Sequence, residues 1–335
     1  MSQPTGMNHV KRFESAVAAQ GRTTSPVAIL ANPKSFSALL RELKMDSADG
    51  LFVERLAHAV SRFAAQERGL LERYFDGTAD LPETASAFVR FLFRQGLQDH
   101  VGLKLVLKTP LGDPMAEHCE YAVKSMLCGR RFPDEVNLFG FGLGDGSWER
   151  KLGEFLIHRG EAGDVSLLGY DPFAVRSPGI KYLDPKRIGD RRSPGFDLVL
   201  ARWALHHVFP EQRWDMFARI LSQLNPGGIA LVVEHGFMER PAMPRHEHLY
   251  RLLNAILDVI ANLGFRPEWF AATKPEFGRD FYVDFLRAQD IDAIRSKCSK
   301  RLDVDVVSAG PNFPWHSIIA FKPRASARRR PISRA

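Results

Sequence analysis

The residues best suited to binding chemistry are four glycines that alternate at the end of an apolar run. The run is residues 135–141, and the glycines are Gly140, Gly142, Gly144 and Gly146. A glycine-rich turn between a strand and a helix exposes backbone N–H groups at the helix N-terminus, where they attract a polar or anionic ligand. Glycine suits such a turn because it allows close approach of the ligand and positive φ angles. We therefore expect a ligand cradle, the alternative being a tight turn that binds nothing.

Side chains that can accept protons follow two later apolar runs. His206 and His207 come directly after one of them, and histidine titrates near neutral pH. This pair is the candidate proton acceptor or substrate contact, the alternative being ordinary packing after a strand. Glu234 and His235 stand near the end of the next run and are further candidates, because ligands of such sheets bind outside the carboxyl ends of the strands. The histidines lack the paired spacing of a zinc site, so we expect no metal.

The elements that must position these residues alternate between strands and helices. Helical patterns cover residues 146–160 and 211–225, and a long amphipathic pattern, 246–264, ends at Gly264. Near-continuous apolar strands between helices indicate a parallel sheet covered on both faces. The five candidate strands of this region are residues 135–141, 164–171, 180–184, 196–203 and 228–236.

The end of the chain departs from this alternation. Residues 301–310 and 316–324 both resemble strands, and the connection between them is too short for a parallel crossover. They should therefore pair antiparallel. The sequence predicts an α/β fold, a doubly wound, mostly parallel seven-stranded sheet that ends in an antiparallel hairpin.

The N-terminal part of the chain is predicted to be mostly helical. Apolar stripes mark helices over residues 47–75, behind a Ser47 cap, and over residues 82–97 and 114–128. We therefore divide the chain into three parts. Residues 1–130 form a helical domain that caps the substrate or mediates dimers, residues 131–323 form the sheet domain, and residues 324–335 form a basic disordered tail.

Composition restricts the class of protein. The chain has 335 residues, 45% hydrophobic and 25% charged, which is typical of a soluble globular protein. No apolar stretch is long enough to span a membrane, and the N-terminus lacks the apolar region of a signal peptide. Three cysteines without a CxxC pair predict neither a disulfide framework nor a structural zinc site, so we expect a cytoplasmic protein.

The spacing of the glycines selects among nucleotide-binding families. A dinucleotide-binding GxGxxG motif would need glycine where Asp145 or Ser147 stands, so the motif is GxGxG. A hydrophobic strand leading into GxGxG resembles the first motif of the class I S-adenosylmethionine-dependent methyltransferases. The resemblance covers residues 134 to about 322 and extends to "FDLVLARWALHHV" and "LNPGGIALVVEHG", with Pro226, Gly227 and Gly228 as a turn before the fifth strand.

The resemblance implies roles for individual residues. Asp171, at the end of the second strand, would hold the ribose hydroxyls of the cofactor, and Asp184, after the third strand, would lie near the adenine. Arg202 and Trp203, at the end of the fourth strand, would bracket the methionine moiety and the substrate. Asp145 would either contact the cofactor or start the following helix, and the four glycines would line the cofactor.

One feature of the family is missing. Its members place a carboxylate two residues before the first glycine, where it meets the amino group of the methionine moiety. The corresponding residue is Leu138 or Gly140, depending on the register of the motif. The amino group therefore needs another partner.

The resemblance implies a methyltransferase that uses S-adenosyl-L-methionine to methylate an O, N or C nucleophile of a small-molecule acceptor, in a biosynthetic pathway. The N-terminal helices would enclose the acceptor or form a homodimer. Two alternatives stay open. The basic tail, in a chain of net charge +7, suits an RNA or protein methyltransferase, and the missing carboxylate suits a non-catalytic regulatory subunit with this fold.

Overall fold

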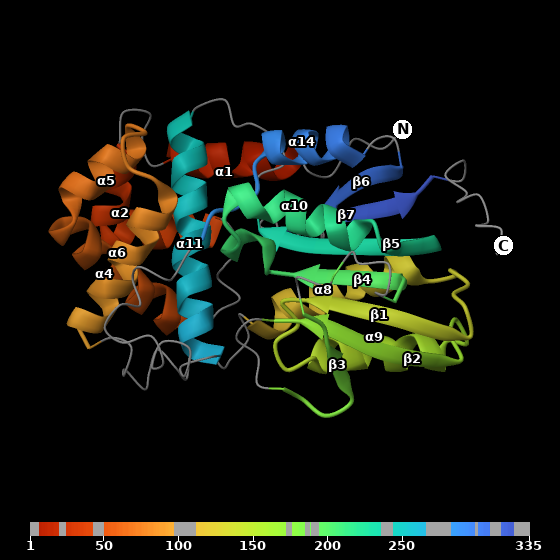
Figure 1. The fold of residues 1–335 in the computed structure, drawn as a ribbon. Helices are drawn as coiled ribbons and strands as arrows, with labels where there is room; N and C mark the ends of the chain where they lie inside the picture. The colour runs from red at the N-terminus through yellow and green to blue at the C-terminus, as the bar shows by residue number, and fades with distance from the viewer. Residues whose placement is uncertain are drawn as a thin grey trace. The chain divides into compact units, whose positions relative to one another are not determined.

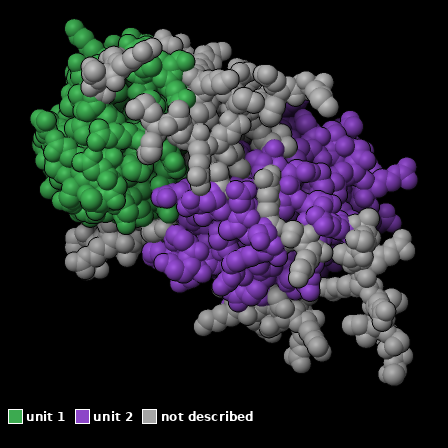
Figure 2. Space-filling view, turned by 90° about the horizontal axis from the view of Figure 1, so that it is seen from above, with its two compact units in different colours: residues 1–118, 236–285, 310–315 green, residues 119–235, 286–309, 316–335 purple. Residues whose placement is uncertain are grey.

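A computed structural model of the chain shows two compact units, each described here by itself (Figure 2). Unit 1 takes residues 1–118, 236–285 and 310–315, and unit 2 takes residues 119–235, 286–309 and 316–335. The residues that the structure describes are 7–19, 25–42, 50–96, 112–171, 176–184, 188, 194–235, 244–265, 283–298, 301–308 and 316–324.

Unit 2 is built on one seven-stranded sheet (Figure 1). The strands lie in the order β3-β2-β1-β4-β5-β7-β6. β1 to β5 are parallel, whereas β7 pairs antiparallel with both β5 and β6. This arrangement confirms the predicted fold, a doubly wound, mostly parallel sheet that ends in an antiparallel hairpin. The strands are β1 (Glu135–Phe141), β2 (Asp164–Tyr170), β3 (Ile180–Tyr182), β4 (Phe196–Arg202), β5 (Leu224–His235), β6 (Leu302–Ser308) and β7 (His316–Pro323).

Helices cover both faces of this sheet. α8 (Gly112–Leu127) and α9 (Ser147–His158) pack on one face, where α9 buries Trp148, Leu152 and Leu156 at a spacing of four residues. α10 (Pro210–Leu221) packs on the other, and its Phe217 ring lies 5.5 Å from that of Phe321 on β7. α14 (Ala288–Cys298) contacts β6 and was not predicted; Ile291 and Ile294 are its only large apolar residues.

The boundaries of β3 and β5 differ from the sequence prediction. β3 has three residues, two fewer than predicted, and β5 begins four residues earlier. Pro226, Gly227 and Gly228 were predicted as a turn before the fifth strand but lie within β5. The pairing of β5 with β4 shifts register at this point, where Gly227 has a φ of 85°. The three residues therefore form an irregularity in the strand.

Unit 1 is helical. Its elements are α1 (Met7–Ala19), α2 (Pro26–Ala31), α3 (Pro33–Glu42), α4 (Gly50–Gln66), α5 (Arg68–Phe75), α6 (Leu81–Arg94) and α11 (Pro244–Phe265). Its core is aromatic and aliphatic, with the Phe63 and Phe88 rings 5.1 Å apart. The helix predicted over residues 47–75 is interrupted at Glu67, beside the poor helix former Gly69. The predicted Ser47 cap lies outside the described residues.

α11 belongs to unit 1, although the sequence analysis placed it in the sheet domain. Its residues pack on α5 and α6, the Tyr250 ring lies 5.3 Å from that of Phe13, and the Tyr74 hydroxyl donates a 2.8 Å hydrogen bond to the His248 carbonyl. The helix also continues through Gly264 to Phe265. The single boundary drawn at residue 130 thus differs from the observed division, because α11 packs with helices far earlier in the chain.

The proposed cap or dimer role of the N-terminal helices stays a prediction. The basic tail lies outside the described residues, except for Arg324. In the part of the chain that the structure describes, no helix is both long enough and apolar enough to cross a membrane.

Candidate functional site

The glycine loop connects β1 to α9 and has the backbone that its composition predicts. Gly142, Gly144 and Gly146 have φ angles of 66°, 61° and 70°, in the left-handed region that side chains disfavour. Gly140 lies within β1. The three glycines with left-handed backbones therefore correspond to the later of the two registers, the one that begins at Gly142.

Part of the glycine pattern serves packing. A Cβ atom on Gly140 would lie 2.8 Å from the Leu143 Cβ, and one on Gly169 would lie 2.6 Å from the Leu143 Cδ2. A Cβ atom on Gly142 would collide with the Ala204 Cβ, which follows β4. Leu143 is buried and needs this room. Sequence reasoning assigned all four glycines to the ligand and missed the packing of Leu143.

The loop is fastened to the end of β2. The Gly144 N–H donates a 2.8 Å hydrogen bond to Asp171 Oδ2, and the Gly142 N–H donates one of 2.7 Å to the Tyr170 carbonyl. Burial raises the pKa of Tyr170, and the negative charges of Asp171 and Asp184 raise it further. The structure thus brings Asp171 together with the glycine loop and places the Asp184 carboxylate close enough to Tyr170 to influence its ionisation.

Asp145 has a structural role at the start of α9. Its Oδ1 accepts a 3.0 Å hydrogen bond from the Ser147 N–H, next to Gly146, which has no side chain with which to cap the helix. Arg150 donates to the Asp145 carbonyl and to the Pro178 carbonyl at 3.1 and 2.9 Å. Of the two roles considered for Asp145, starting the helix is the one that these contacts support.

The residues at the end of β4 form a cationic and aromatic group. The Arg202 guanidinium carbon lies 4.8 Å from the centre of the Trp148 ring and 5.1 Å from that of Trp203. Trp203 has a φ of 49°, unusual for a residue with a side chain, and its N–H donates to the Val233 carbonyl at 2.8 Å. Such backbone conformations cost about 1–3 kcal/mol and are concentrated at functional sites.

A buried histidine–glutamate pair follows directly. His206 lies in the single turn η3 (Leu205–His207), and its Nδ1 is 2.5 Å from Glu234 Oε2. The other carboxylate oxygen accepts hydrogen bonds from the Ala204 and Leu205 N–H groups, at 2.9 and 2.6 Å. Burial would raise the pKa of Glu234, but His206 and the two backbone N–H groups outweigh burial and lower it. Glu234 is therefore an ionised carboxylate at neutral pH.

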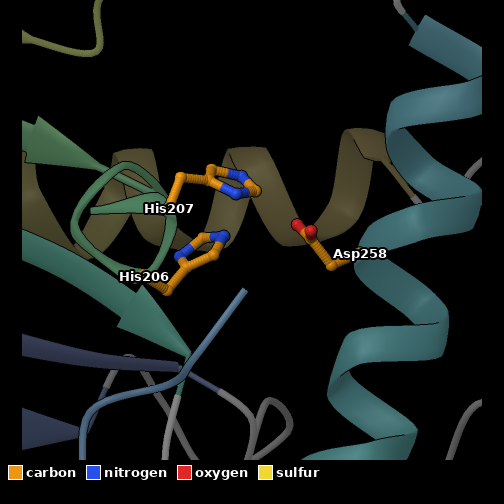
Figure 3. Close-up of side chains that lie close together, drawn as sticks. All are labelled: His206, His207 and Asp258. Carbon is orange, nitrogen blue, oxygen red and sulfur yellow. The ribbon is translucent and has the colours of Figure 1, made fainter. Parts of the chain in front are cut away.

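This arrangement fixes which nitrogen of His206 accepts a proton. A carboxylate only accepts hydrogen bonds, so the Nδ1 that faces Glu234 carries a hydrogen. In the neutral imidazole the basic atom is then Nε2. His207 lies beside it, with the ring centres 4.1 Å apart (Figure 3). Asp258, also drawn there, belongs to α11 of unit 1.

The burial of the predicted histidines is described for His206 and His207 but not for His235. His206 is completely buried and His207 is partly buried. The backbone of His235 pairs with that of His316 at the end of β5, and its side chain lies outside the description. Of the four predicted catalytic residues, the structure brings His206, His207 and Glu234 together.

Sequence reasoning overlooked one buried acid, Glu149. It lies in the first turn of α9 with 3% of its surface exposed. Burial raises its pKa to about 7; the positive charge of Arg202 opposes the rise, and the negative charges of Asp145 and Asp171 contribute to it. An acidic residue in a first helical turn usually indicates only a favourable interaction with the helix dipole, so the sequence held no distinct signal.

Comparison with known proteins finds only distant structural similarities. No protein-family model matches the chain, and no curated protein matches its sequence. Among solved structures, the CMeT domain of the citrinin polyketide synthase is 15% identical, with 85% of this chain and 68% of that chain covered and a TM-score of 0.44. The CurJ carbon methyltransferase is 12% identical, with coverages of 96% and 91% and a TM-score of 0.42.

A third structure, the DhpI-SAM-HEP complex, is 15% identical, with 69% of this chain and 98% of that chain covered and a TM-score of 0.39. Since these TM-scores are below 0.5, the similarities carry no argument about this chain. The strand order and the terminal hairpin agree with what the sequence resemblance to the class I methyltransferases implies. Any activity must be argued from the site.

Proposed function

We propose that the chain is an S-adenosylmethionine-dependent methyltransferase that acts on the O, N or C atom of a small-molecule acceptor. The observation that carries the proposal is the buried His206–Glu234 pair, which joins the turn after β4 to the end of β5 at the same edge of the sheet as the glycine loop. Gly142 of that loop packs on Ala204, so the loop and the η3 turn are in contact. The proposed ligand cradle therefore lies beside the proposed proton acceptor.

The residues present fit the cofactor. The glycines at 142, 144 and 146 have backbones that side chains would strain, as a close-fitting cradle requires. Asp171 and Asp184, after β2 and β3, supply carboxylates for ribose hydroxyls and for the adenine, and Arg202 with Trp203 would adjoin the methionine moiety. S-adenosylmethionine, when bound, supplies a methyl group that its sulfonium already activates.

The contribution of the chain is then positioning and proton removal. His206 Nε2 would accept the proton that an acceptor atom loses as it is methylated. Glu234 holds the imidazole in the tautomer whose Nε2 carries no hydrogen and is the basic atom, and stabilises the imidazolium that results. Such a pair favours an acceptor that has a proton to lose, such as an enolisable carbon, a hydroxyl group or a protonated amine.

The small-molecule acceptor and the biosynthetic role are the finer parts of the proposal. They are supported by a sequence in which no recognisable RNA-binding module precedes the sheet domain. The position of the base relative to the loop supports transfer to a small nucleophile without selecting among oxygen, nitrogen and carbon.

The proposal is tested by measuring S-adenosylhomocysteine formation from S-adenosylmethionine with three panels of acceptors: 1,3-dicarbonyl compounds, phenols and primary amines. We expect turnover with one panel, and a fall in kcat of about 10²–10⁴-fold in His206→Ala with little change in KM for the cofactor. His207→Ala is the matched control and should lose less. Full activity of His206→Ala with every acceptor that the wild type methylates would refute the assigned base.

A further inference from the structure

A buried carboxyl group at the glycine loop has no part in the chemistry described above. Glu149 is buried, with 3% of its surface exposed to solvent. Within the described part of the chain, its Oε2 has no hydrogen-bond partner. Buried polar atoms in folded proteins are nearly always paired, and an exception points to a missing ligand or another functional role. The backbone N–H of Glu149 itself hydrogen-bonds the carboxyl group, but Oε2 needs a partner from outside the described residues.

The position of Glu149 identifies where that partner binds. A Cβ atom on Gly140 would lie 3.0 Å from Glu149 Oε1 and 3.2 Å from its carboxyl carbon. The carboxyl group therefore occupies the space that a side chain at position 140 would take. In the register that begins at Gly142, position 140 is two residues before the first glycine, where the resembling family carries a carboxylate. Here a helix, rather than the strand, brings a carboxylate to the same place.

The charges around Glu149 indicate the chemistry of the partner. Asp145 in the loop and Asp171 after β2 disfavour its ionisation, and Arg202 at the end of β4 favours it. The guanidinium of Arg202 lies against the rings of Trp148 and Trp203. Arg202 therefore interacts with these two rings as well as with the charge of Glu149. A second cation with several N–H donors would satisfy the unpaired oxygen and stabilise the ionised form. A primary ammonium group has these properties.

We infer that Glu149 binds the α-ammonium group of the methionine moiety, in place of the carboxylate absent from position 140. The inference rests on the proposed function and deepens it, because it names the partner that the amino group lacked in the sequence. It also removes the one sequence feature that suited a non-catalytic subunit.

Two ligands that differ in the amino-acid moiety test the inference by calorimetric titration. S-adenosylhomocysteine carries the ammonium group, whereas 5′-methylthioadenosine lacks the whole amino-acid part. We expect Glu149→Gln to weaken S-adenosylhomocysteine binding about tenfold to a hundredfold and to leave 5′-methylthioadenosine binding unchanged. Glu154→Gln, on the exposed side of α9, is the matched control and should change neither.

The pH dependence of affinity gives a second measurement that a merely structural role would not produce. Because the ammonium group needs an ionised carboxylate, wild-type affinity for S-adenosylhomocysteine should fall below about pH 7, by up to about tenfold per pH unit. The dependence should be weaker in Glu149→Gln and weaker for 5′-methylthioadenosine.

The outcomes separate this inference from the proposed function. If the wild type binds neither ligand, the proposed function fails. If Glu149→Gln keeps full affinity for S-adenosylhomocysteine, or loses affinity for both ligands equally, Glu149 does not bind the ammonium group, although the proposed function stands.

Discussion

The hydrogen bonds of Glu234 predict different effects for two substitutions at this position. In Glu234→Gln the side-chain oxygen still accepts from the Ala204 and Leu205 N–H groups, which both donate to Oε1. The amide nitrogen takes the place of Oε2 and donates to His206 Nδ1. The imidazole must then carry its hydrogen on Nε2, which removes the proton acceptor. Glu234→Ala removes all three hydrogen bonds.

The magnitudes follow from these contacts. Glu234→Ala leaves two backbone N–H groups and the ring N–H buried without a partner, at about 1–3 kcal/mol each, so we expect a loss of stability above about 3 kcal/mol. Glu234→Gln replaces charge-assisted bonds with neutral ones and should cost about 1–2 kcal/mol. Urea unfolding at neutral pH, followed by circular dichroism, measures both losses, with Glu211→Gln, on the exposed side of α10, as control.

The tautomer is read directly by NMR of protein labelled with ¹⁵N-histidine. We expect the hydrogen of His206 on Nδ1 in the wild type and on Nε2 in Glu234→Gln, with His207 unchanged. If His206 has the same tautomer in both proteins, Glu234 does not set it and the assigned proton acceptor is wrong. If the alanine and glutamine variants are equally stable, the hydrogen bonds from the Ala204 and Leu205 N–H groups to Glu234 do not stabilise the η3 turn.

Three further predictions concern the loop, the opposite end of the sheet and the buried acid. Gly142→Ala should destabilise the protein by about 1–3 kcal/mol and abolish S-adenosylhomocysteine binding, because the new Cβ meets Ala204 at a positive φ; an unchanged melting temperature would contradict this. Asp197→Ala should cost about 2 kcal/mol in urea unfolding, since Asp197 accepts from the β1 backbone and from Asn225, yet leave ligand affinity unchanged; weaker binding would place it in the site. The pKa of Glu149 is raised to about 7 in the folded protein, so ligand-free wild type should lose stability relative to Glu149→Gln as pH rises from about 4.3 to 7. Urea unfolding measures this, and a difference in unfolding free energy that does not change with pH would refute the raised pKa.

Much of the fold follows from local sequence patterns. The strands of unit 2 are apolar runs whose composition and flanking turns identify them without tertiary information, and the short link before β7 requires antiparallel pairing. The grouping of α11 with unit 1 does not follow from such patterns. Its apolar face matches the N-terminal helices, which lie more than a hundred residues away in the sequence, and no local signal names the partner of an amphipathic helix.

The candidate site likewise has features that the sequence predicts and features that it does not. The positive φ angles of the glycine loop were predictable because only glycine adopts them readily, and the His206–His207 pair was visible as two adjacent titratable rings. The bonds from Glu234 to the η3 turn were not predictable, because they join residues about 30 positions apart. The role of Glu149 depends on how α9 is rotated over Gly140, which is set by the burial of Trp148 and Leu152 on the sheet.

The measurement that tests the central claim most directly is calorimetric titration of the full chain with S-adenosylmethionine and S-adenosylhomocysteine. The wild type should bind both in the micromolar range, and Asp171→Ala should weaken binding at least about tenfold, because Asp171 both orders the loop through Gly144 and is proposed to hold the ribose. Asp164→Ala, at the other end of β2, is the control and should bind as the wild type does. If the wild type binds neither ligand, the glycine loop is not a cradle for this cofactor and the account is wrong.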